Sequence, residues 1–333
     1  MQRQEEQNLI GESQAFMAVL DQVSRVAPLN KPVLVVGERG TGKELIASRL
    51  HYLSLRWDRP FIKLNCAALA ESLLETELFG HEAGAFTGAT RRRLGRFELA
   101  NEGSLFLDEL ANTSGRIQEK ILRVIEYGDF ERVGGSETVI TNVRIIAATN
   151  EDLPGLALLG KFREDLLDRL AFDVITLPPL RERQEDIMKL ADHFAVKMAG
   201  ELGMEYFPGF TEVAEQILLD YQWPGNVREL KNVVERAVYR SEDQSAAIDQ
   251  IDLDPFDSPW RLRSPEAESA APPSATEGPL DFKQHIAEYE TRLLKEALAA
   301  CKFNQRKTAD YLGMTYHQLR GYLRKYELTE SAE

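Results

Sequence analysis

One octapeptide restricts the possible folds of this chain more than any other feature. It is GERGTGKE, residues 37–44, and it directly follows the apolar run VLVV. Its G-x-x-x-x-G-K spacing is typical of a loop that binds phosphate groups between a buried strand and a helix. The glycines let backbone N–H groups converge on phosphates, Lys43 reaches the terminal phosphates, and the helix beginning there adds its positive dipole end. The candidate nucleotide ligands are Gly37, Glu38, Arg39, Gly40, Thr41, Gly42, Lys43 and Glu44.

A nucleotide site also needs acidic groups, and the strand-like segment SLFLDEL, residues 104–110, supplies them. Adjacent carboxylates at the end of a buried strand are costly unless they face a cation or a solvated crevice. We therefore assign Asp108 to a magnesium ion and Glu109 to polarising the water that attacks ATP. Solvated acids at a strand end are the alternative, which the nearby phosphate loop makes less attractive. Glu44 stands where a hydroxyl ligand of magnesium is usual.

Polar residues also follow two other apolar segments. Thr149 and Asn150 end the run RIIAATN, and Asn65 follows FIKL. Because the carboxyl ends of parallel strands meet at one edge of a sheet, these side chains could sense the γ-phosphate or position water. A turn residue that is satisfied locally is an equally good interpretation of each.

The alternation of strand-like and helical patterns predicts an α/β fold. Strand-like runs at 33–36, 104–110 and 142–150 are separated by helical spacing, which indicates a parallel sheet covered on both faces. From 185 to 240 the spacing is helical throughout. Residues 255–279 contain six of the fourteen prolines and indicate a flexible linker. Since 333 residues are too many for one core, we predict an α/β subdomain (1–172), a helical subdomain (173–250), a linker (251–280) and a C-terminal domain (281–333).

Composition excludes several classes of protein. No apolar run approaches the roughly 18–20 residues that span a bilayer, and the N-terminus lacks the basic-then-apolar order of a signal peptide. Cys66 and Cys301 lie far apart and without metal-ligand spacing, which favours a reducing, cytoplasmic setting. The net charge of −14 argues against coating nucleic acid along the whole surface, but it permits a local basic module.

The segment EAGAFTGATRRR, residues 82–93, places an apolar residue among glycines. Glycines here indicate a mobile or tightly turned loop, and an apolar tip on such a loop favours contact with another protein. The alternative from composition alone is that Phe86 is tucked in and completes the core.

The C-terminal segment 302–325 is basic, with six Lys or Arg and the single acid Asp310. Ala309 and Gly313 lie four apart, which suits the crossing and turn of a helix-turn-helix unit whose second helix runs from about 315 to 325. Residues 312, 314, 319 and 322 are expected to pack, and a plain basic hairpin is the alternative. The candidate DNA contacts are Tyr316, His317 and Arg320 toward bases, and Lys307, Arg324 and Lys325 toward phosphates. Thr315, at the start of the second helix, is a further DNA-binding candidate.

These motifs together resemble a known family. GERGTGKE, GAFTGA, LFLDE, FREDLLDRL and WPGNVREL, in this order, look like the AAA+ domain of sigma-54-dependent transcriptional activators, over about residues 8–240. NQRKTADYLGMTYHQLR resembles the Fis-type DNA-binding domain of the same activators. The family commonly carries Glu after the lysine, so Glu44 fits. The resemblance implies an AAA+ α/β domain, an all-α lid, a C-terminal helix-turn-helix and a cytoplasmic homo-hexamer with ATP between subunits.

The resemblance also implies roles for individual residues. Arg163 and Arg169 look like arginine fingers that act on the nucleotide of the neighbouring subunit, a role that suits a guanidinium group. From the residues alone, surface ion pairs with Glu164, Asp165 and Asp168 are the better interpretation. Arg228 resembles the lid arginine that contacts phosphates, with a pair to Glu229 as the alternative. Ile10 and Gly11 are implied to lie near the adenine.

In the family, the GAFTGA loop engages sigma-54 in RNA polymerase, and ATP hydrolysis raises and lowers it. The resemblance therefore implies that Gly84, Ala85, Phe86, Thr87, Gly88 and Ala89 form the sigma-54 contact. Residues 127–137 look like a second loop that supports the first. The implied function is a transcription activator that binds upstream enhancer DNA and uses ATP and Mg²⁺ to convert the closed polymerase complex into the open complex. A nucleotide-controlled DNA-binding regulator without remodelling activity is the alternative.

The segment before the first strand has about 30 residues, so we expect this chain to lack the sensory domain that most members carry. We expect control in trans, as in the branch of the family that responds to envelope stress and is held off by a separate inhibitor protein. Trp57, in the turn-like LSLRWDRP, is the candidate inhibitor contact. A partly buried Trp that packs a loop is an equal alternative.

Overall fold

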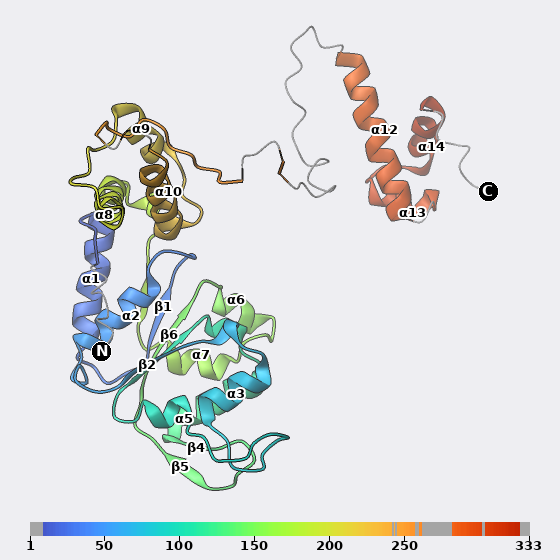
Figure 1. Cartoon of the computed structure of the whole chain (residues 1–333). Coiled ribbons are helices and arrows are strands. Elements are labelled where there is room, and N and C mark those ends of the chain that lie inside the picture. Colours follow the sequence, from blue (N-terminus) through green and yellow to red (C-terminus); the bar gives the residue numbers. More distant parts are fainter. Residues whose placement is uncertain are drawn as a thin grey trace. The chain divides into compact units, whose positions relative to one another are not determined.

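The computed structural model describes residues 9–241, 243, 245–256, 260–261, 282–301 and 304–326. The chain forms two compact units, Met1–Pro255 and Phe256–Glu333 (Figure 1). Most of the predicted linker 251–280 lies outside the described residues, as does Lys302 of the basic segment. Among the described helices, none combines the length and the apolar character that crossing a bilayer requires.

A five-stranded parallel sheet organises the first unit. Its order is β2-β3-β6-β1-β7, so the strand that precedes the phosphate loop lies between β6 and β7. In the register, Asn65 pairs with Asp108 and Val36 pairs with Thr149, which brings the predicted polar strand ends to one edge. The strands are β1 (Val33–Val36), β2 (Phe61–Asn65), β3 (Ser104–Asp108), β6 (Arg144–Thr149) and β7 (Val174–Thr176).

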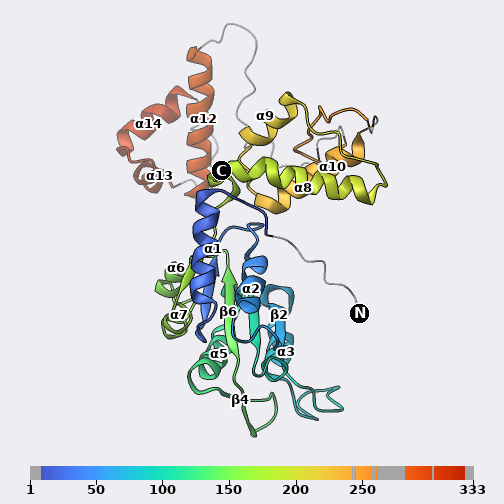
Figure 2. The ribbon, with the colours of Figure 1, turned by 90° about the vertical axis from the view of Figure 1, so that its left-hand side faces the viewer.

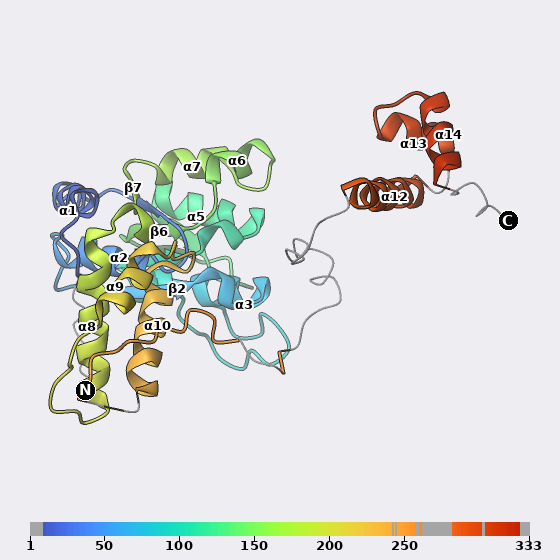
Figure 3. The ribbon, with the colours of Figure 1, turned by 90° about the horizontal axis from the view of Figure 1, so that it is seen from above.

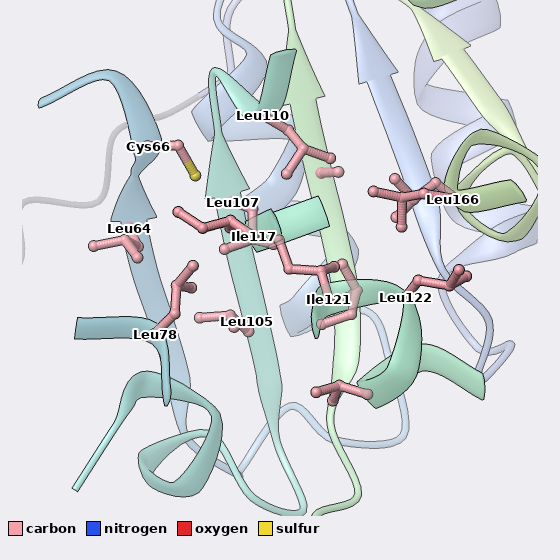
Figure 4. Packing of buried hydrophobic residues seen from close by; sticks show 14 of the residues in the cluster. Leu64, Cys66, Leu78, Leu105, Leu107, Leu110, Ile117, Ile121, Leu122 and Leu166 are labelled. Carbon is pink, nitrogen blue, oxygen red and sulfur yellow. The ribbon is translucent and has the colours of Figure 1, made fainter. Parts of the chain in front are cut away.

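Helices cover both faces of this sheet, as predicted (Figure 3). Side chains alternate along β3: Leu105 and Leu107 belong to one hydrophobic cluster, and Phe106 belongs to the cluster on the opposite face. Figure 4 shows Leu105 and Leu107 packed near Ile117 and Ile121. The first cluster is formed with α3 (Glu71–Phe79), α4 (Arg96–Leu99), α5 (Gly115–Tyr127), α6 (Leu153–Leu158) and α7 (Glu164–Leu170), and the second with α1 (Gln14–Val26) and α2 (Lys43–Tyr52).

Short elements complete the α/β part. The segment predicted as a second loop is a hairpin of β4 (Asp129–Glu131) and β5 (Thr138–Ile140), which pair antiparallel. The 3₁₀ turns are η1 (Cys66–Ala68), η2 (Leu110–Asn112) and η3 (Leu180–Glu182). The hairpin and β7 were not predicted, because strands of three residues are too short to show an apolar pattern.

Three helices pack together beyond η3 in the region predicted to be helical (Figure 2). They are α8 (Glu185–Glu201), α9 (Glu212–Asp220) and α10 (Asn226–Arg240). Trp223 is fully buried at their centre, and its Nε1 donates to the Leu218 carbonyl at 2.8 Å. The indole is thus satisfied in the core, and this helical part has its own hydrophobic cluster.

The second unit contains α12 (Phe282–Ala300), α13 (Gln305–Tyr311) and α14 (Tyr316–Lys325). Thr315 caps α14, and Gly313 takes the left-handed conformation (φ 63°) that the turn needs. The expectation that residue 322 packs is wrong: Tyr322 is 38% exposed, and Leu323 is buried instead. The reason is helical spacing, because Leu319 and Leu323 are four apart and share the packed face.

Candidate functional site

The phosphate loop connects β1 to α2 and has the predicted glycine geometry. Gly40 (φ 78°) and Gly42 (φ 100°) adopt backbone conformations that favour glycine. The Lys43 ammonium donates to the carbonyls of Gly37 (2.9 Å) and Glu38 (3.2 Å), which places it at the centre of the loop. Burial lowers the pKa of Lys43, while the charges of Asp108 and Glu109 act in the opposite direction. The lysine and the acidic pair therefore share one site.

The acidic pair lies at the end of β3. Burial raises the pKa of Asp108, and the nearby Lys43 opposes this change. Glu109 has a left-handed backbone (φ 53°), and its N–H donates to Asp108 Oδ1 at 3.1 Å. Such a conformation is uncommon for a residue other than glycine and is found at functional sites. It turns the chain at the strand end, and the two carboxylates accept hydrogen bonds from different side chains.

Asn65, Thr149 and Asn150 lie at the same sheet edge. The Asn65 amide donates to Asp108 Oδ2 at 3.2 Å, and its oxygen accepts from the Ala67 N–H. The Asn150 amide nitrogen donates to the Glu109 carboxylate in the orientation that satisfies both of its polar atoms. Thr149 is buried, and its hydroxyl accepts from the Glu151 N–H. Asn65 and Thr149 thus make the turn contacts of the second interpretation, and Asn65 also contacts Asp108 of the site.

The helical part contacts the phosphate loop directly. A Cβ added to Gly40 would lie 2.2 Å from the Gly225 carbonyl oxygen and 3.1 Å from Arg228 Cβ, so Arg228 lies beside the loop. The Glu38 carboxylate accepts from Arg181 and Asn226, and these bonds lower its pKa to about 2. Sequence reasoning missed Arg181 and Asn226. The second lies inside WPGNVREL, which indicated only its arginine.

Ile10 and Gly11 lie between the two parts of the first unit. Ile10 packs against the helical cluster, and a Cβ on Gly11 would meet Phe16 at 2.6 Å and Asp186 at 2.8 Å. Asp186 of α8 is fully buried and accepts from the Ser13 N–H and hydroxyl at 2.9 and 2.7 Å. Residues 10–13 are therefore fixed to the helical part.

The two candidate arginine fingers lie on the surface at α7. Arg163 donates to Asp165 at 3.0 and 2.7 Å, so the surface ion pair expected from the residues alone is present. Arg169 pairs instead with Glu126 of α5 at 2.8 Å. Their side chains are 39% and 60% exposed, which leaves both accessible to a second molecule.

The segment EAGAFTGATRRR forms a protruding loop. Gly84 (φ 83°) and Gly88 (φ 101°) turn the chain in open space, and the Gly84 N–H donates to the Ala89 carbonyl at 2.7 Å. Phe86 is 48% exposed, with its ring against His81, so it does not complete the core. Thr87 beside it is exposed. The loop therefore presents an apolar and a hydroxyl group at its tip.

Charged residues hold the base of this loop. Arg93 pairs with Glu77 at 2.8 Å, which explains one of the arginines that follow the glycines. Arg132, from the β4–β5 hairpin, is buried and pairs with Glu82 and Glu98. A Cβ on Gly134 would lie 2.6 Å from Ala85 Cβ. The hairpin loop is thus in direct contact with the GAFTGA loop, as a supporting loop should be.

The remaining candidate residues are exposed. Trp57 is 63% exposed, and its turn is anchored by Arg56, which donates to the carbonyls of Gly103 and Asn142. The second unit presents its candidate DNA contacts on and beside α14, and all are accessible to solvent: Lys307, Thr315, Tyr316, His317, Arg320, Arg324 and Lys325.

A parallel sheet with this phosphate loop, an acidic pair at the neighbouring strand end and a helical lid defines the class of AAA+ ATPases. Within the chain, residues 9–176 match the sigma-54 interaction domain, residues 181–263 the AAA+ ATPase lid domain and residues 285–326 the Fis family of bacterial regulatory proteins. The chain belongs to the family of sigma-54-dependent transcriptional activators. It is an ATPase that activates sigma-54-dependent transcription.

Similar proteins support this assignment. The Psp operon transcriptional activator of Escherichia coli K12 is 57% identical over 326 residues, which cover 96% of this chain and 98% of that protein. The Nif-specific regulatory protein of Azotobacter vinelandii is 46% identical over 94% of this chain, which spans 58% of that protein. The crystal structure of Brucella abortus NtrX in complex with ATP has a TM-score of 0.70 at 33% identity and covers 96% of this chain and 70% of NtrX.

Proposed function

We propose that this chain couples ATP hydrolysis at the Lys43–Asp108 site to movement of the GAFTGA loop, and that the moving loop converts the closed sigma-54 polymerase complex into the open complex. The observation that carries the proposal is the half-exposed Phe86 at the tip of a glycine-hinged loop. That loop belongs to the same α/β unit as the phosphate site, and no structural role in the core accounts for its tip.

Each residue of the site has its own role in ATP hydrolysis. Lys43 and the loop N–H groups bind and orient the phosphates, and Arg228 adds a cation from the lid. Glu109 polarises the attacking water, while Asn65 and Asn150 orient the two carboxylates through the hydrogen bonds described above. Thr149, at the end of β6, senses the γ-phosphate or positions water. Ile10 and Gly11 border the adenine.

The donor set fits a magnesium ion that is bound together with nucleotide. In the described part of the chain, no group of three His, Cys, Asp or Glu residues could hold a metal ion by itself. Magnesium usually takes one or two carboxylates and completes its shell with phosphates and water. Asp108 would supply the carboxylate here, and the bound ion would neutralise phosphate charge.

The site is completed by a second copy of the chain. Arg163 and Arg169 are exposed on α7, where they can approach the nucleotide of a neighbouring subunit in a ring, and we propose a homo-hexamer. A guanidinium that reaches the transferring phosphate in this way is typically worth about 10³–10⁵ in rate.

The C-terminal unit tethers the ring to upstream DNA. The exposed cations Lys307, Arg320 and Arg324 suit phosphate and base contacts by α14 in the major groove. Because a single helix-turn-helix binds weakly, several units on tandem sites are needed. The similarity to the Psp operon activator supports phage-shock promoters as the target.

A separate inhibitor protein controls this activity through Trp57. The indole is exposed, and so are two apolar side chains close to it in the sequence, Leu55 (82%) and Tyr52 (54%). Exposed aromatic residues are typical binding anchors. The Trp57→Ala variant is expected to keep its ATPase activity and to lose sensitivity to the inhibitor. Unchanged sensitivity would show that the inhibitor docks elsewhere.

The test of the proposed function separates turnover from remodelling. Phe86→Ala and Thr87→Ala should hydrolyse ATP at the wild-type rate but fail to bind sigma-54 and to form open complexes on a purified promoter. Phe172→Ala is the matched control, since Phe172 is similarly exposed (52%, against 48% for Phe86) and lies outside the loop. If both loop variants lose ATP turnover in parallel, the loop is a structural part of the ATPase. Open complexes formed by the loop variants at the wild-type rate would show that the loop does not drive remodelling. A wild-type chain that hydrolyses ATP without forming open complexes would favour the alternative regulator without remodelling activity.

A further inference from the structure

Glu38 is an acid of the phosphate loop to which the chemistry of hydrolysis described above assigns no step. Its carboxylate accepts both terminal nitrogens of Arg181, at 3.0 Å from Nη1 to Oε2 and 2.6 Å from Nη2 to Oε1. This fork geometry fixes orientation as well as distance. Arg181 belongs to η3, the 3₁₀ turn between the sheet and the lid helices. The phosphate loop is therefore bonded to the hinge of the lid.

Asn226 adds a second connection at the same point. Its side chain is fully buried, and its amide nitrogen donates to Glu38 Oε2 and to the Arg39 carbonyl, each at 3.0 Å. Its amide oxygen accepts the Leu180 N–H at 2.7 Å. One side chain at the start of α10 thus bonds the phosphate loop and the hinge simultaneously.

The backbones of the lid and the phosphate loop approach closely at this contact. Asn226 has a left-handed conformation (φ 53°), and the preceding Gly225 carbonyl is so close to Gly40 that a Cβ there would lie 2.2 Å from its oxygen. A rotation of the lid must therefore either break the bonds to Glu38 and Arg39 or displace the loop that holds the phosphates.

We propose that Glu38, Arg181 and Asn226 form a clamp that transmits the position of the lid to the phosphate loop. Arg181 and Asn226 are positioning residues, since they act through Glu38 and the loop backbone. With the clamp closed, the loop N–H groups are held in the geometry that binds phosphates. Nucleotide binding and lid orientation then favour each other, as linkage requires.

The test uses the full chain with Trp57→Phe and Trp260→Phe, which leaves Trp223 as the only tryptophan. Trp223 lies three residues before Asn226 and is fully buried in the lid core, so its emission reports on the base of the lid. ADP is titrated, and ATP turnover is measured in parallel. Arg181→Gln and Glu38→Gln should raise the KM for ATP by about tenfold, change kcat less, and reduce the Trp223 response at saturating ADP.

A double-mutant cycle separates a clamp from independent effects. If Glu38 and Arg181 act as a pair, the double variant should bind ADP about as well as either single variant. Arg181→Lys keeps the charge without the fork and should recover part of the response. Arg240→Gln is the control, because it removes an arginine–carboxylate pair with Asp252 on the lid, away from the loop.

Either of two results would overturn the clamp. One is that Arg181→Gln and Arg181→Lys both keep the wild-type KM for ATP and the wild-type Trp223 response. The other is that the losses of ADP affinity in the double-mutant cycle are fully additive. The KM for ATP and the Trp223 response are both measured without sigma-54. A negative result for the clamp is therefore distinguishable from a negative result for the remodelling function.

Discussion

Gly40 shows how closely two parts of the chain approach at a single residue. Its φ of 78° disfavours any side chain, and an added Cβ would lie 2.2 Å from the Gly225 oxygen. The backbone of Gly42 (φ 100°) is likewise unfavourable for a residue with a side chain, but the nearest neighbour of an added Cβ would be Leu45 Cδ1 at 3.9 Å. We expect Gly42→Ala to cost about 1–2 kcal/mol in free energy of unfolding. Gly40→Ala should cost more and also raise the KM for ATP, because the lid must shift. Thermal unfolding measures the loss of stability, and steady-state kinetics measure the KM for ATP. Equal effects of Gly40→Ala and Gly42→Ala would contradict the close contact between Gly40 and Gly225.

Glu38 also predicts a pH dependence of stability. The bonds from Arg181 and Asn226 lower its pKa from 4.5 to about 2 in the folded protein. A carboxyl whose folded pKa is depressed adds stability that is fully present above its unfolded pKa and is lost as the pH falls through the folded value. Urea unfolding should therefore show a constant difference between wild type and Glu38→Gln from about pH 6 to 8, and a shrinking one from about pH 4.5 toward 2. A difference that persists at the acidic end would refute the assignment.

Individual residues differ in how far the sequence alone could place them. Lys43 and Asp108 were predicted to meet because each ends or follows a strand of a parallel sheet, and the structure brings them together. The bonds from Glu38 to Arg181 and Asn226 join residues 143 and 188 positions apart, and no local pattern carries such information. Individual roles in catalysis and DNA binding stay predictions.

At the scale of elements, the β4–β5 hairpin determines how the GAFTGA loop is supported. Gly134 (φ 72°) would place a Cβ 2.6 Å from Ala85 Cβ. Gly134→Ala should therefore displace the loop and weaken sigma-54 binding about tenfold, while ATP turnover stays within about twofold of wild type. Gly160→Ala is the matched control, since Gly160 has a similar φ of 67° in open space. Binding assays with the two variants test this, and equal affinities would exclude a supporting role.

Long elements were predicted better than short ones. The central strands and the helices from 185 to 240 were confirmed, because burial imposes a visible apolar period on them. The three-residue strands β4, β5 and β7 were missed, since their pairing depends on tertiary neighbours. In α14, the predicted packing of residue 322 failed, because the cap at Thr315 begins the helix so that Leu319 and Leu323 face inward.

At the scale of the whole molecule, the exposed arginines predict that the active site is shared between subunits. Lys43→Ala and Arg169→Ala should each be inactive alone. Mixed in equal amounts, they should regain activity, because about a quarter of randomly assembled sites would pair an intact lysine with an intact arginine. ATP turnover of the mixture measures this. No recovery in mixed assemblies would mean that Arg169 acts within its own chain or only in its surface pair with Glu126.

The central claim is that the nucleotide state controls the position of the GAFTGA tip. Thr87→Cys in a Cys301→Ser background allows this to be measured, because Cys66 is buried and its pKa is raised to about 12, which keeps it unreactive. The rate of thiol modification at residue 87 is compared in full rings with ADP and with ADP plus a metal fluoride that mimics the transferring phosphate. The account predicts rates that differ several-fold between the two states. Identical rates would contradict it.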